Sequence, residues 1–323
     1  MPITIAIARQ ADALAPRVAV TGASGFIGST VTRALAAEGW QVRALTRTDS
    51  WAGRLRDQGL EVTVGSLAEP AALDELVTGV DAVVHCAGAV RGSCYADFAE
   101  INVAGTENLI AAMAGRHLPL VALSSLAARE PQLSDYARSK QAMEALLAET
   151  DIPLDCLVLR PPAVYGPGDT ELKPLFDAFA RGLAPLPGAP DARVSLLYVD
   201  DLAAAIVAWL NASERTGGVY EIGDASARGY SWDEVVRTAE TLLERRIRRI
   251  PVPGAALDGV AWVNTRMSRW LGYAPMLTPG KLQELRHADW VCDNRPLQQM
   301  LDWAPQVDLA AGLKTTCGWG RAA

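Results

Sequence analysis

The stretch VAVTGASGFIG, residues 18–28, constrains this chain more than any other. A short apolar run is followed at once by glycines at positions 22, 25 and 28 and then by an amphipathic segment. This order predicts a buried strand, a tight turn and a helix that cradle a dinucleotide. Gly22 would permit the turn, Gly25 would leave room for a pyrophosphate, and Gly28 would bring the helix close to the sheet. A turn that needs glycine only for steric reasons is the alternative.

Strands and helices alternate on both sides of this turn. Apolar runs predict strands, and amphipathic segments between them predict helices. Such alternation indicates an α/β fold, a doubly wound parallel sheet with helices on both faces. The predicted strands are 18–20, 41–45, 61–64, 81–86, 118–123 and 154–159, and the predicted helices are 26–38, 51–58, 70–78, 98–113 and 134–149.

Beyond residue 160 the pattern changes to a loop rich in Pro and Gly, followed by shorter elements. We expect a strand at 194–199, a helix at 202–210 capped by Asp200 and Asp201, and a strand at 218–223. Ser231 and Glu234 form a capping-box pattern that opens a helix running to about residue 245. We therefore divide the chain into a nucleotide-binding domain (17–167 plus 195–225) and a substrate lobe (168–194 plus 226–323).

Composition narrows the class of protein. Half of the 323 residues are hydrophobic and the formal net charge is −7, which favours a globular protein with no nucleic-acid partner and no attraction to anionic membranes. Five scattered cysteines and three histidines without ligand spacing predict neither a metal site nor a disulfide framework. The start of the chain does not resemble a signal peptide and no apolar run could span a bilayer, so we expect a cytoplasmic protein. Ile3, Ile5 and Ile7 alternate as in an edge strand or belong to an ordered tail.

Two patterns could carry chemistry. Tyr136 and Lys140 lie four residues apart on a predicted helix and would share one face. A phenol has a pKa of about 10, and lowering it by roughly three units needs about 4 kcal/mol, which a neighbouring ammonium could supply. Ser124 and Ser125 follow a predicted strand, on the ligand side of the sheet. The alternatives are an exposed helix face and a loop or N-cap serine pair.

Taken together, the motifs resemble those of the extended short-chain dehydrogenase/reductases, also called the NAD-dependent epimerase/dehydratase family. The resemblance covers about residues 17–210 strongly and the C-terminal lobe loosely. The matching stretches are TGASGFIG (21–28), DAVVHCAG (81–88), NVAGTEN (102–108), LSS (123–125), YARSK (136–140), LRPPAVYGP (159–167) and YVDDL (198–202).

The resemblance implies a Rossmann-type domain with a smaller, mainly helical substrate lobe. It implies that Tyr136 is the acid/base, that Lys140 lowers its pKa and holds the nicotinamide ribose, and that Ser125 orients the substrate oxygen. It also implies a homodimer formed through the helices 98–113 and 134–149. The implied cofactor groove is lined by Gly22, Ser24, Gly25, Phe26, Ile27, Gly28, Arg47, Ser66, Leu67, Ala87, Gly88, Asn102, Tyr136, Lys140, Pro162 and Val164, with Asn102 contacting the cofactor or bracing the groove.

Departures from the family pattern refine these expectations. Thr46 and Arg47 stand where NAD-preferring members carry a carboxylate, which favours NADP(H) over NAD(H), although a solvated Arg47 is the alternative. Ser66 replaces the Asp that usually meets the adenine amine. Leu126 and Ala127 follow the serines where dehydratases carry Asp-Glu, so dehydration is not expected.

The substrate is predicted to be a small or moderately apolar carbonyl compound or alcohol. Nucleotide-sugar epimerases often carry an arginine where this chain has Val194, with Arg193 on the opposite strand face. We predict an NAD(P)-dependent oxidoreductase that interconverts a secondary alcohol and a ketone. A nucleotide-sugar 4-epimerase with tightly bound NAD and a non-catalytic dinucleotide-binding scaffold are the alternatives.

Two further features belong to the substrate lobe. The arginine-rich run 245–249 is expected to be a solvated helix end, with a phosphate site as the alternative. The tryptophans are expected to pack in the core or to line an apolar pocket; they are Trp262, Trp270, Trp290, Trp303 and Trp319.

Overall fold

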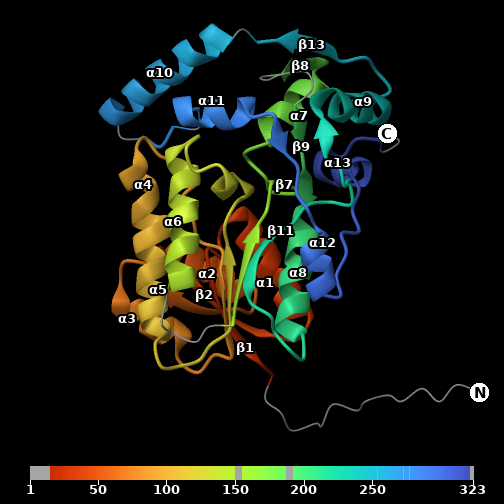
Figure 1. Ribbon diagram of the computed structural model, residues 1–323. Helices are drawn as coiled ribbons and strands as arrows, with labels where there is room; N and C mark the ends of the chain where they lie inside the picture. The colour runs from red at the N-terminus through yellow and green to blue at the C-terminus, as the bar shows by residue number, and fades with distance from the viewer. Residues whose placement is uncertain are drawn as a thin grey trace, which may run out of the picture.

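The computed structural model of the chain describes residues 15–149, 155–186, 192–252, 254–271, 273–275 and 277–320. The alternating segment at residues 3–7 lies outside these residues. The described part has a Rossmann-type layer below and a smaller lobe above it (Figure 1).

A seven-stranded sheet in which all the paired strands are parallel forms the centre of the lower layer, in the order β11-β6-β5-β4-β1-β2-β3. The strand order reverses between β1 and β4, and ligands of such sheets bind at the carboxyl ends of the strands at this point. The doubly wound fold predicted from the sequence is therefore confirmed. The strands are β1 (Arg17–Thr21), β2 (Gln41–Thr46), β3 (Glu61–Val64), β4 (Ala82–His85), β5 (Leu120–Leu123), β6 (Cys156–Arg160) and β11 (Gly218–Glu221).

Helices cover both faces of this sheet, because its apolar strands must be buried on both sides. One apolar core includes Val31 of α1 and Trp209 of α8, and a second includes Leu73 of α3, Leu109 of α5 and Met143 of α6. Figure 1 shows α4, α5 and α6 on one side of the sheet and α8 on the other. The helices are α1 (Phe26–Ala37), α2 (Asp49–Asp57), α3 (Pro70–Val77), α4 (Tyr95–Ala99), α5 (Gly105–Met113), α6 (Asp135–Glu149) and α8 (Val199–Asn211).

The upper lobe lies over the carboxyl ends of the strands (Figure 1). It has a core of its own, which contains Phe176, Phe179 and Trp319. Its helices are α7 (Lys173–Ala180), α9 (Trp232–Leu243), α10 (Gly254–Leu271), α11 (Pro279–Arg286) and α13 (Leu309–Cys317), while α12 (Arg295–Met300) packs beside β11. Three short sheets complete the described part of the chain. They are the pair β7 (Ala163–Tyr165) with β10 (Leu196–Tyr198), the three-stranded sheet of β12 (Tyr230–Ser231), β9 (Arg193–Val194) and β14 (Asp289–Trp290), and the pair β8 (Leu183–Leu186) with β13 (Arg248–Pro251).

Several local expectations need correction. The helix predicted at 98–113 begins earlier, at Tyr95, and contains a π-helical segment, η1 (Glu100–Ala104). The strand predicted at 194–199 divides into β9 and β10. Asp200 and Asp201 do not cap a helix but lie in the first turn of α8, where the Asp201 carboxylate accepts hydrogen bonds from the backbone N–H groups of Gln306 and Val307, both at 3.0 Å. Asp201 thereby anchors the C-terminal segment.

The capping box of Ser231 and Glu234 is confirmed, and both of its hydrogen bonds are present at the start of α9. The arginine run after α9 is not simply a solvated helix end. Its last two residues enter β13, where the Arg249 guanidinium pairs with Glu240 at 2.7 Å and with Asp233 at 3.0 Å.

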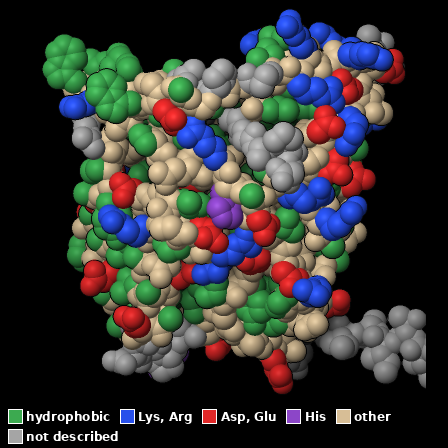
Figure 2. Space-filling model, turned by 45° about the horizontal axis from the view of Figure 1, so that its top comes forward, with side chains coloured by type: hydrophobic (Ala, Val, Ile, Leu, Met, Phe, Trp, Pro, Cys, Tyr) green, Lys and Arg blue, Asp and Glu red, His purple; other side chains and the backbone are tan. Residues whose placement is uncertain are grey.

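The tryptophans of the lobe fall into two groups. Trp319 is buried in the core and Trp290 is half-buried, with its indole N–H donated to the Glu284 carbonyl. Trp262 and Trp270 are 58% and 87% exposed, so core packing is wrong for these two. In Figure 2, hydrophobic side chains project at the upper left corner, where α10 lies in Figure 1.

Candidate active site

The glycine turn after β1 leaves no space for side chains. Gly22 has φ +72°, and a Cβ atom built on it would lie 2.6 Å from the Ala87 backbone nitrogen. A Cβ atom on Gly28 would lie 2.1 Å from the Gly22 carbonyl oxygen. Gly25 is the N-cap of α1, without a side-chain cap and without an acidic residue in the first turn. The first N–H groups of α1 therefore remain available to an anion, which fits the pyrophosphate of a dinucleotide.

The loop after β4 forms the opposite side of this turn. A Cβ atom on Gly88 would lie 3.1 Å from Lys140 Nζ and 3.2 Å from Asn102 Oδ1. Asn102 is fully buried in η1, and its amide bonds the Ala89 backbone N–H (2.8 Å), the Ala89 carbonyl (3.1 Å) and the Ser139 hydroxyl (2.9 Å). Asn102 therefore braces the groove, while its contact with a cofactor stays a prediction.

His85 at the end of β4 joins three elements beneath the groove. Its Nδ1 lies 2.7 Å from the Thr21 hydroxyl of β1, and its Nε2 lies 3.0 Å from the Thr106 hydroxyl of α5. Burial, assisted by the charge of Lys140, lowers the pKa of His85 to about 3, so the imidazole is neutral in the folded protein. Sequence reasoning missed this role, because one histidine at a strand end carries no recognisable signal.

His85 makes the fold sensitive to acid. The unfolded chain takes up a proton on this residue near pH 6.5, whereas the folded protein does so only near pH 3, so stability falls as the pH drops through this window. Glutamine cannot titrate, so the free energy of unfolding of His85→Gln should depend less on pH than that of the unmodified protein. The two slopes should differ by up to about 1.4 kcal/mol per pH unit. Urea unfolding of both proteins between pH 7 and about pH 4 measures the difference. Parallel pH profiles would refute the assignment of a neutral buried imidazole.

Ser124 and Ser125 follow β5 and face different partners. The Ser125 hydroxyl lies close enough to the Tyr136 phenol to lower its pKa, and it caps the short helix η2 (Leu126–Arg129) by accepting the Ala127 N–H at 3.2 Å. The Ser124 hydroxyl instead donates to the Glu144 carboxylate, whose Oε1 lies 2.9 Å from Arg160 Nε. The structure thus brings Ser125, rather than Ser124, to Tyr136.

Lys140 lies one turn after Tyr136 on α6 and is 4% exposed. Its ammonium donates a hydrogen bond to the Leu123 carbonyl at 2.8 Å, at the end of β5. Burial lowers the pKa of Lys140 to about 8, although Glu144 and Cys86 act in the opposite direction. Burial likewise raises the pKa of Tyr136, opposed by the Ser125 hydrogen bond and the charge of Lys281. At neutral pH, the phenol therefore carries a proton that it can donate.

Tyr136 lines a cavity of about 240 Å³ between the two layers. One wall is the loop at residues 90–93, and the other is formed by Pro275 and residues 278–284 of the upper lobe. In that segment Lys281 Nζ lies 2.9 Å from the Glu284 carboxylate, which also accepts a hydrogen bond from the Ser134 hydroxyl next to α6. Sequence reasoning missed Lys281 and Glu284, whose only signal was the helix start at Thr278 and Pro279.

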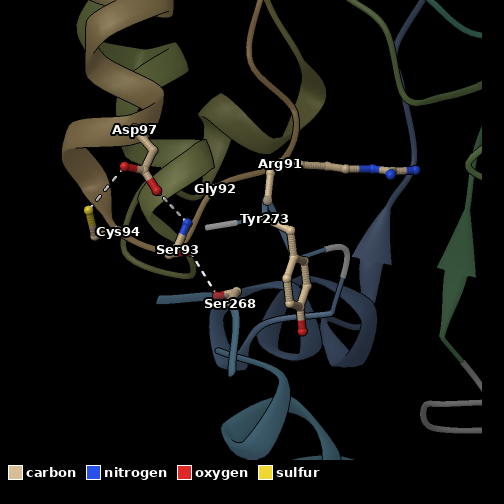
Figure 3. A pocket seen from close by; sticks show the side chains of 8 residues that line it. Arg91, Gly92, Ser93, Cys94, Asp97, Ser268 and Tyr273 are labelled. Carbon is tan, nitrogen blue, oxygen red and sulfur yellow. Dashed lines mark hydrogen bonds between the residues drawn. The ribbon is translucent and has the colours of Figure 1, made fainter. Parts of the chain in front are cut away.

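A second, outer cavity of about 580 Å³ adjoins this inner cavity and shares Arg91, Gly92 and Ser93 with it. Its upper wall contains Ser268 of α10 and Tyr273. The Ser93 backbone N–H donates to the Asp97 carboxylate at 2.6 Å, and the Ser93 and Ser268 hydroxyls lie 3.0 Å apart. Figure 3 marks both contacts with dashed lines. This contact holds the loop after β4 against α10.

The remaining predicted cofactor residues lie around the strand ends. Leu67 is buried against Gly105, and the Ser66 hydroxyl donates to Glu69 Oε1 at 2.7 Å. The Phe26 ring lies beside the loop at 166–168. Ser24 and Ile27 are half-buried in the turn and at the start of α1, and Pro162 and Val164 are half-buried after β6.

The positions diagnostic of other reactions have structural roles. Leu126 and Ala127 are buried apolar residues where a dehydratase would need acid/base groups. The Arg193 guanidinium donates to the carbonyls of Arg228 (2.6 Å) and Gly229 (2.9 Å) and pairs with Glu234 (3.0 Å). It therefore fixes the corner between β12 and α9.

Within the described ranges, no group of three or more His, Cys, Asp or Glu side chains could hold a metal ion. All five cysteines are free, and burial raises the pKa of the Cys86 thiol in the groove to about 12. Among the described helices, none combines the length and the apolarity that crossing a membrane requires.

A parallel sheet whose strand order reverses between β1 and β4, with a glycine turn after β1 and an uncapped helix start behind it, is the architecture of a dinucleotide-binding domain. The chain belongs to the NAD dependent epimerase/dehydratase family, whose sequence model matches residues 18–223.

Characterised relatives of this chain include reductases. It is 36% identical over 311 residues to the ceramide reductase of Caulobacter vibrioides, covering 95% of each chain. It is 34% identical over 212 residues to the 2-alkyl-3-oxoalkanoate reductase of Stenotrophomonas maltophilia, covering 58% of this chain and 63% of the relative. The family and these relatives support an NAD-dependent oxidoreductase or epimerase.

Solved structures share the fold. MoeE5 in complex with UDP-glucuronic acid and NAD superposes with a TM-score of 0.71 at 24% identity, over 94% of this chain and 98% of that one. The crystal structure of gox2253 gives a TM-score of 0.72 at 21% identity, over 95% and 98% of the two chains. At these identities the likeness concerns the architecture alone.

Proposed function

We propose that this protein is an NAD(P)H-dependent reductase that converts a ketone on a long-chain, lipid-like molecule into a secondary alcohol. The observation that carries the proposal is the position of Tyr136 at the wall of the inner cavity, with the Ser125 hydroxyl close enough to lower the pKa of its phenol and the buried ammonium of Lys140 one turn away. The reductases among the relatives support the direction and the substrate class.

The chain's own groups would divide the work as follows. The N-terminus of α1 and the turn at Gly22 would hold the pyrophosphate, and Lys140 would hold the nicotinamide ribose. When bound, the reduced nicotinamide supplies a hydride to the carbonyl carbon. The Ser125 hydroxyl donates a hydrogen bond to the ketone oxygen and fixes its position. Tyr136 then gives its phenolic proton to that oxygen, and Lys140 stabilises the phenolate that remains.

Substrate assays test this function. Purified protein is mixed with NADPH or NADH and with a 3-oxo ceramide, a 2-alkyl-3-oxoalkanoate or UDP-glucose, and the loss of reduced nicotinamide is followed. We expect turnover with at least one of the two oxo lipids and none with the sugar nucleotide. Epimerisation of UDP-glucose by protein that retains NAD through gel filtration would establish the epimerase instead. Cofactor binding without turnover of any substrate would establish a scaffold.

We further propose that the cofactor is NADP(H). Arg47 follows β2, is exposed, and forms no hydrogen bond or ion pair within the described part of the chain. Thr46 before it is buried and neutral, so no carboxylate stands there to repel a 2′-phosphate. A guanidinium in this place could bind the phosphate through charge-assisted hydrogen bonds.

Arg47→Ala should therefore raise the Kd for NADPH by about 10- to 100-fold and leave the Kd for NADH nearly unchanged. Fluorescence titration of the two cofactors measures both constants. Arg56→Ala on α2, which removes another exposed arginine, is the matched control and should change neither. Tighter binding of NADH than of NADPH by the unmodified protein would overturn the proposed preference.

A further inference from the structure

Helix α10 has its polar and apolar faces the wrong way round for a helix in contact with water. Apart from the partly buried Leu257, its inward stripe is small or polar: Ala261 and Ser268 are buried, and Asn264 and Thr265 between them are partly buried. Asn264 bonds the Leu277 carbonyl at 2.9 Å, and the Ser268 hydroxyl lies 3.0 Å from that of Ser93. Amphipathic helices of globular proteins normally turn their apolar stripe inward.

The outward face of α10 and the turn after it form one apolar patch, which we call the α10 patch. It contains seven of the twelve large hydrophobic side chains that are exposed in the described residues, so the exposure is concentrated rather than scattered. Figure 2 shows hydrophobic side chains standing out at this corner of the molecule. The α10 patch consists of Val260, Trp262, Val263, Met267, Trp270, Leu271 and Tyr273.

The chemistry of the patch matches a membrane surface. Tryptophan is suited to the boundary between lipid head groups and acyl chains, since its ring is apolar and its N–H is polar. The Arg266 guanidinium lies 5.3 Å from the centre of the Trp262 ring, which adds a positive charge to the same face. The exposed arginines after α9 are not part of this face, since α9 and α10 lie at opposite ends of the upper lobe (Figure 1). A basic side chain such as Arg266 beside an apolar patch favours anionic lipids.

The position of the α10 patch also fits a membrane surface. Ser268, Tyr273 and Ala274, at the end of α10, line the outer cavity, which shares the loop at 90–93 with the cavity at Tyr136. The apolar corner therefore lies next to the outer cavity, which in turn adjoins the cavity at Tyr136. A second copy of the chain bound to the α10 patch would cover the outer cavity. A bilayer bound there would instead place lipid molecules next to this cavity.

We infer that the α10 patch binds the surface of an anionic lipid bilayer. The negative charge of the whole chain does not oppose this binding decisively, since the interaction depends on local charge within a Debye length of about 10 Å. Binding to vesicles needs no substrate, so the inference stands or falls independently of the proposed reaction.

Co-sedimentation with vesicles tests the inference. The full chain with NADPH is mixed with vesicles of phosphatidylcholine alone or with phosphatidylglycerol. We expect binding to the anionic vesicles, weakened by about 0.5 M salt. Trp262→Gln with Trp270→Gln should lower the vesicle partition coefficient on the order of tenfold. Trp51→Gln is the matched control, because Trp51 is an exposed tryptophan on α2, outside the patch, and should bind as the unmodified protein does.

Absence of binding to the anionic vesicles, or equal binding by the double variant, would overturn the inference. Light scattering after gel filtration measures the oligomeric state and so tests the other occupant, a second copy of the chain. If the unmodified protein is a dimer that binds no vesicles, and the double variant is a monomer, the patch is a dimer interface. The double variant should keep the melting temperature and the NADPH Kd of the unmodified protein. If it fails to fold, Met267→Gln with Leu271→Gln tests the same face.

Discussion

Tyr136→Phe is expected to lower kcat for ketone reduction by about 10³-fold and to leave the Kd for the cofactor within about twofold. The substitution removes the phenolic proton and keeps the ring, which makes an edge-to-face contact with Phe98 at 5.9 Å between centroids. The fold around the cavity should therefore be unchanged. Steady-state kinetics and fluorescence titration measure the two quantities.

Two further variants sharpen this test. Tyr95→Phe removes a phenol on α4, whose ring lies under the Arg138 guanidinium, and should leave kcat unchanged. Ser125→Ala should lower kcat by a smaller factor than Tyr136→Phe, because it removes an orienting hydrogen bond but not the proton donor. Full activity of Tyr136→Phe would show that the proton comes from another group.

Lys140→Met is expected to abolish turnover yet to stabilise the protein without cofactor at pH 7, by about 2 kcal/mol. The pKa of Lys140 falls from 10.5 in the unfolded chain to about 8 in the folded one. This difference of 10.5 − 8 = 2.5 corresponds to about 3 kcal/mol at pH values below 8, from which the lost hydrogen bond to Leu123 subtracts about 1 kcal/mol.

The pH dependence gives the sign of this effect. Between pH 8 and 10.5 the unfolded chain holds a proton on Lys140 that the folded protein has released, so stability rises with pH in this window. The advantage of Lys140→Met should accordingly shrink as the pH rises from 8 to 10. Urea unfolding at several pH values measures it, with Lys314→Met, at an exposed lysine of α13, as the control. If Lys140→Met were less stable than the unmodified protein at pH 7, the claim that the buried ammonium of Lys140 destabilises the fold would be wrong.

The sequence predicts the nucleotide-binding half well because its signals are local. A strand, a turn that only glycine can form at Gly22 and a helix start are adjacent in the chain, so their geometry follows from neighbouring residues. The same holds for the capping box at Ser231. The roles of the predicted site residues, the division into two domains and the homodimer remain predictions.

Features that depend on distant contacts were not predictable in this way. Lys281 and Glu284 reach the cavity of Tyr136 only because the upper lobe folds over the sheet. Asp201 resembles a helix cap in sequence, yet its carboxylate is taken by backbone N–H groups more than 100 residues further along the chain. Trp262 and Trp270 resemble core residues by type, and only the rotation of α10 about its axis shows them to be outside.

The π-helical segment η1 has a consequence for how this chain can vary. A π-helical turn holds one residue more than an α-helical turn, so it shifts the angular phase of everything that follows it. Here that shift allows Asn102 to face the loop after β4 while Leu109 and Met113 of α5 face the sheet. Loss of one residue from 100–104 would restore a continuous α-helix. Asn102 could then no longer face the loop after β4 while the apolar stripe of α5 faces the sheet. The length of this segment is therefore as constrained as its composition.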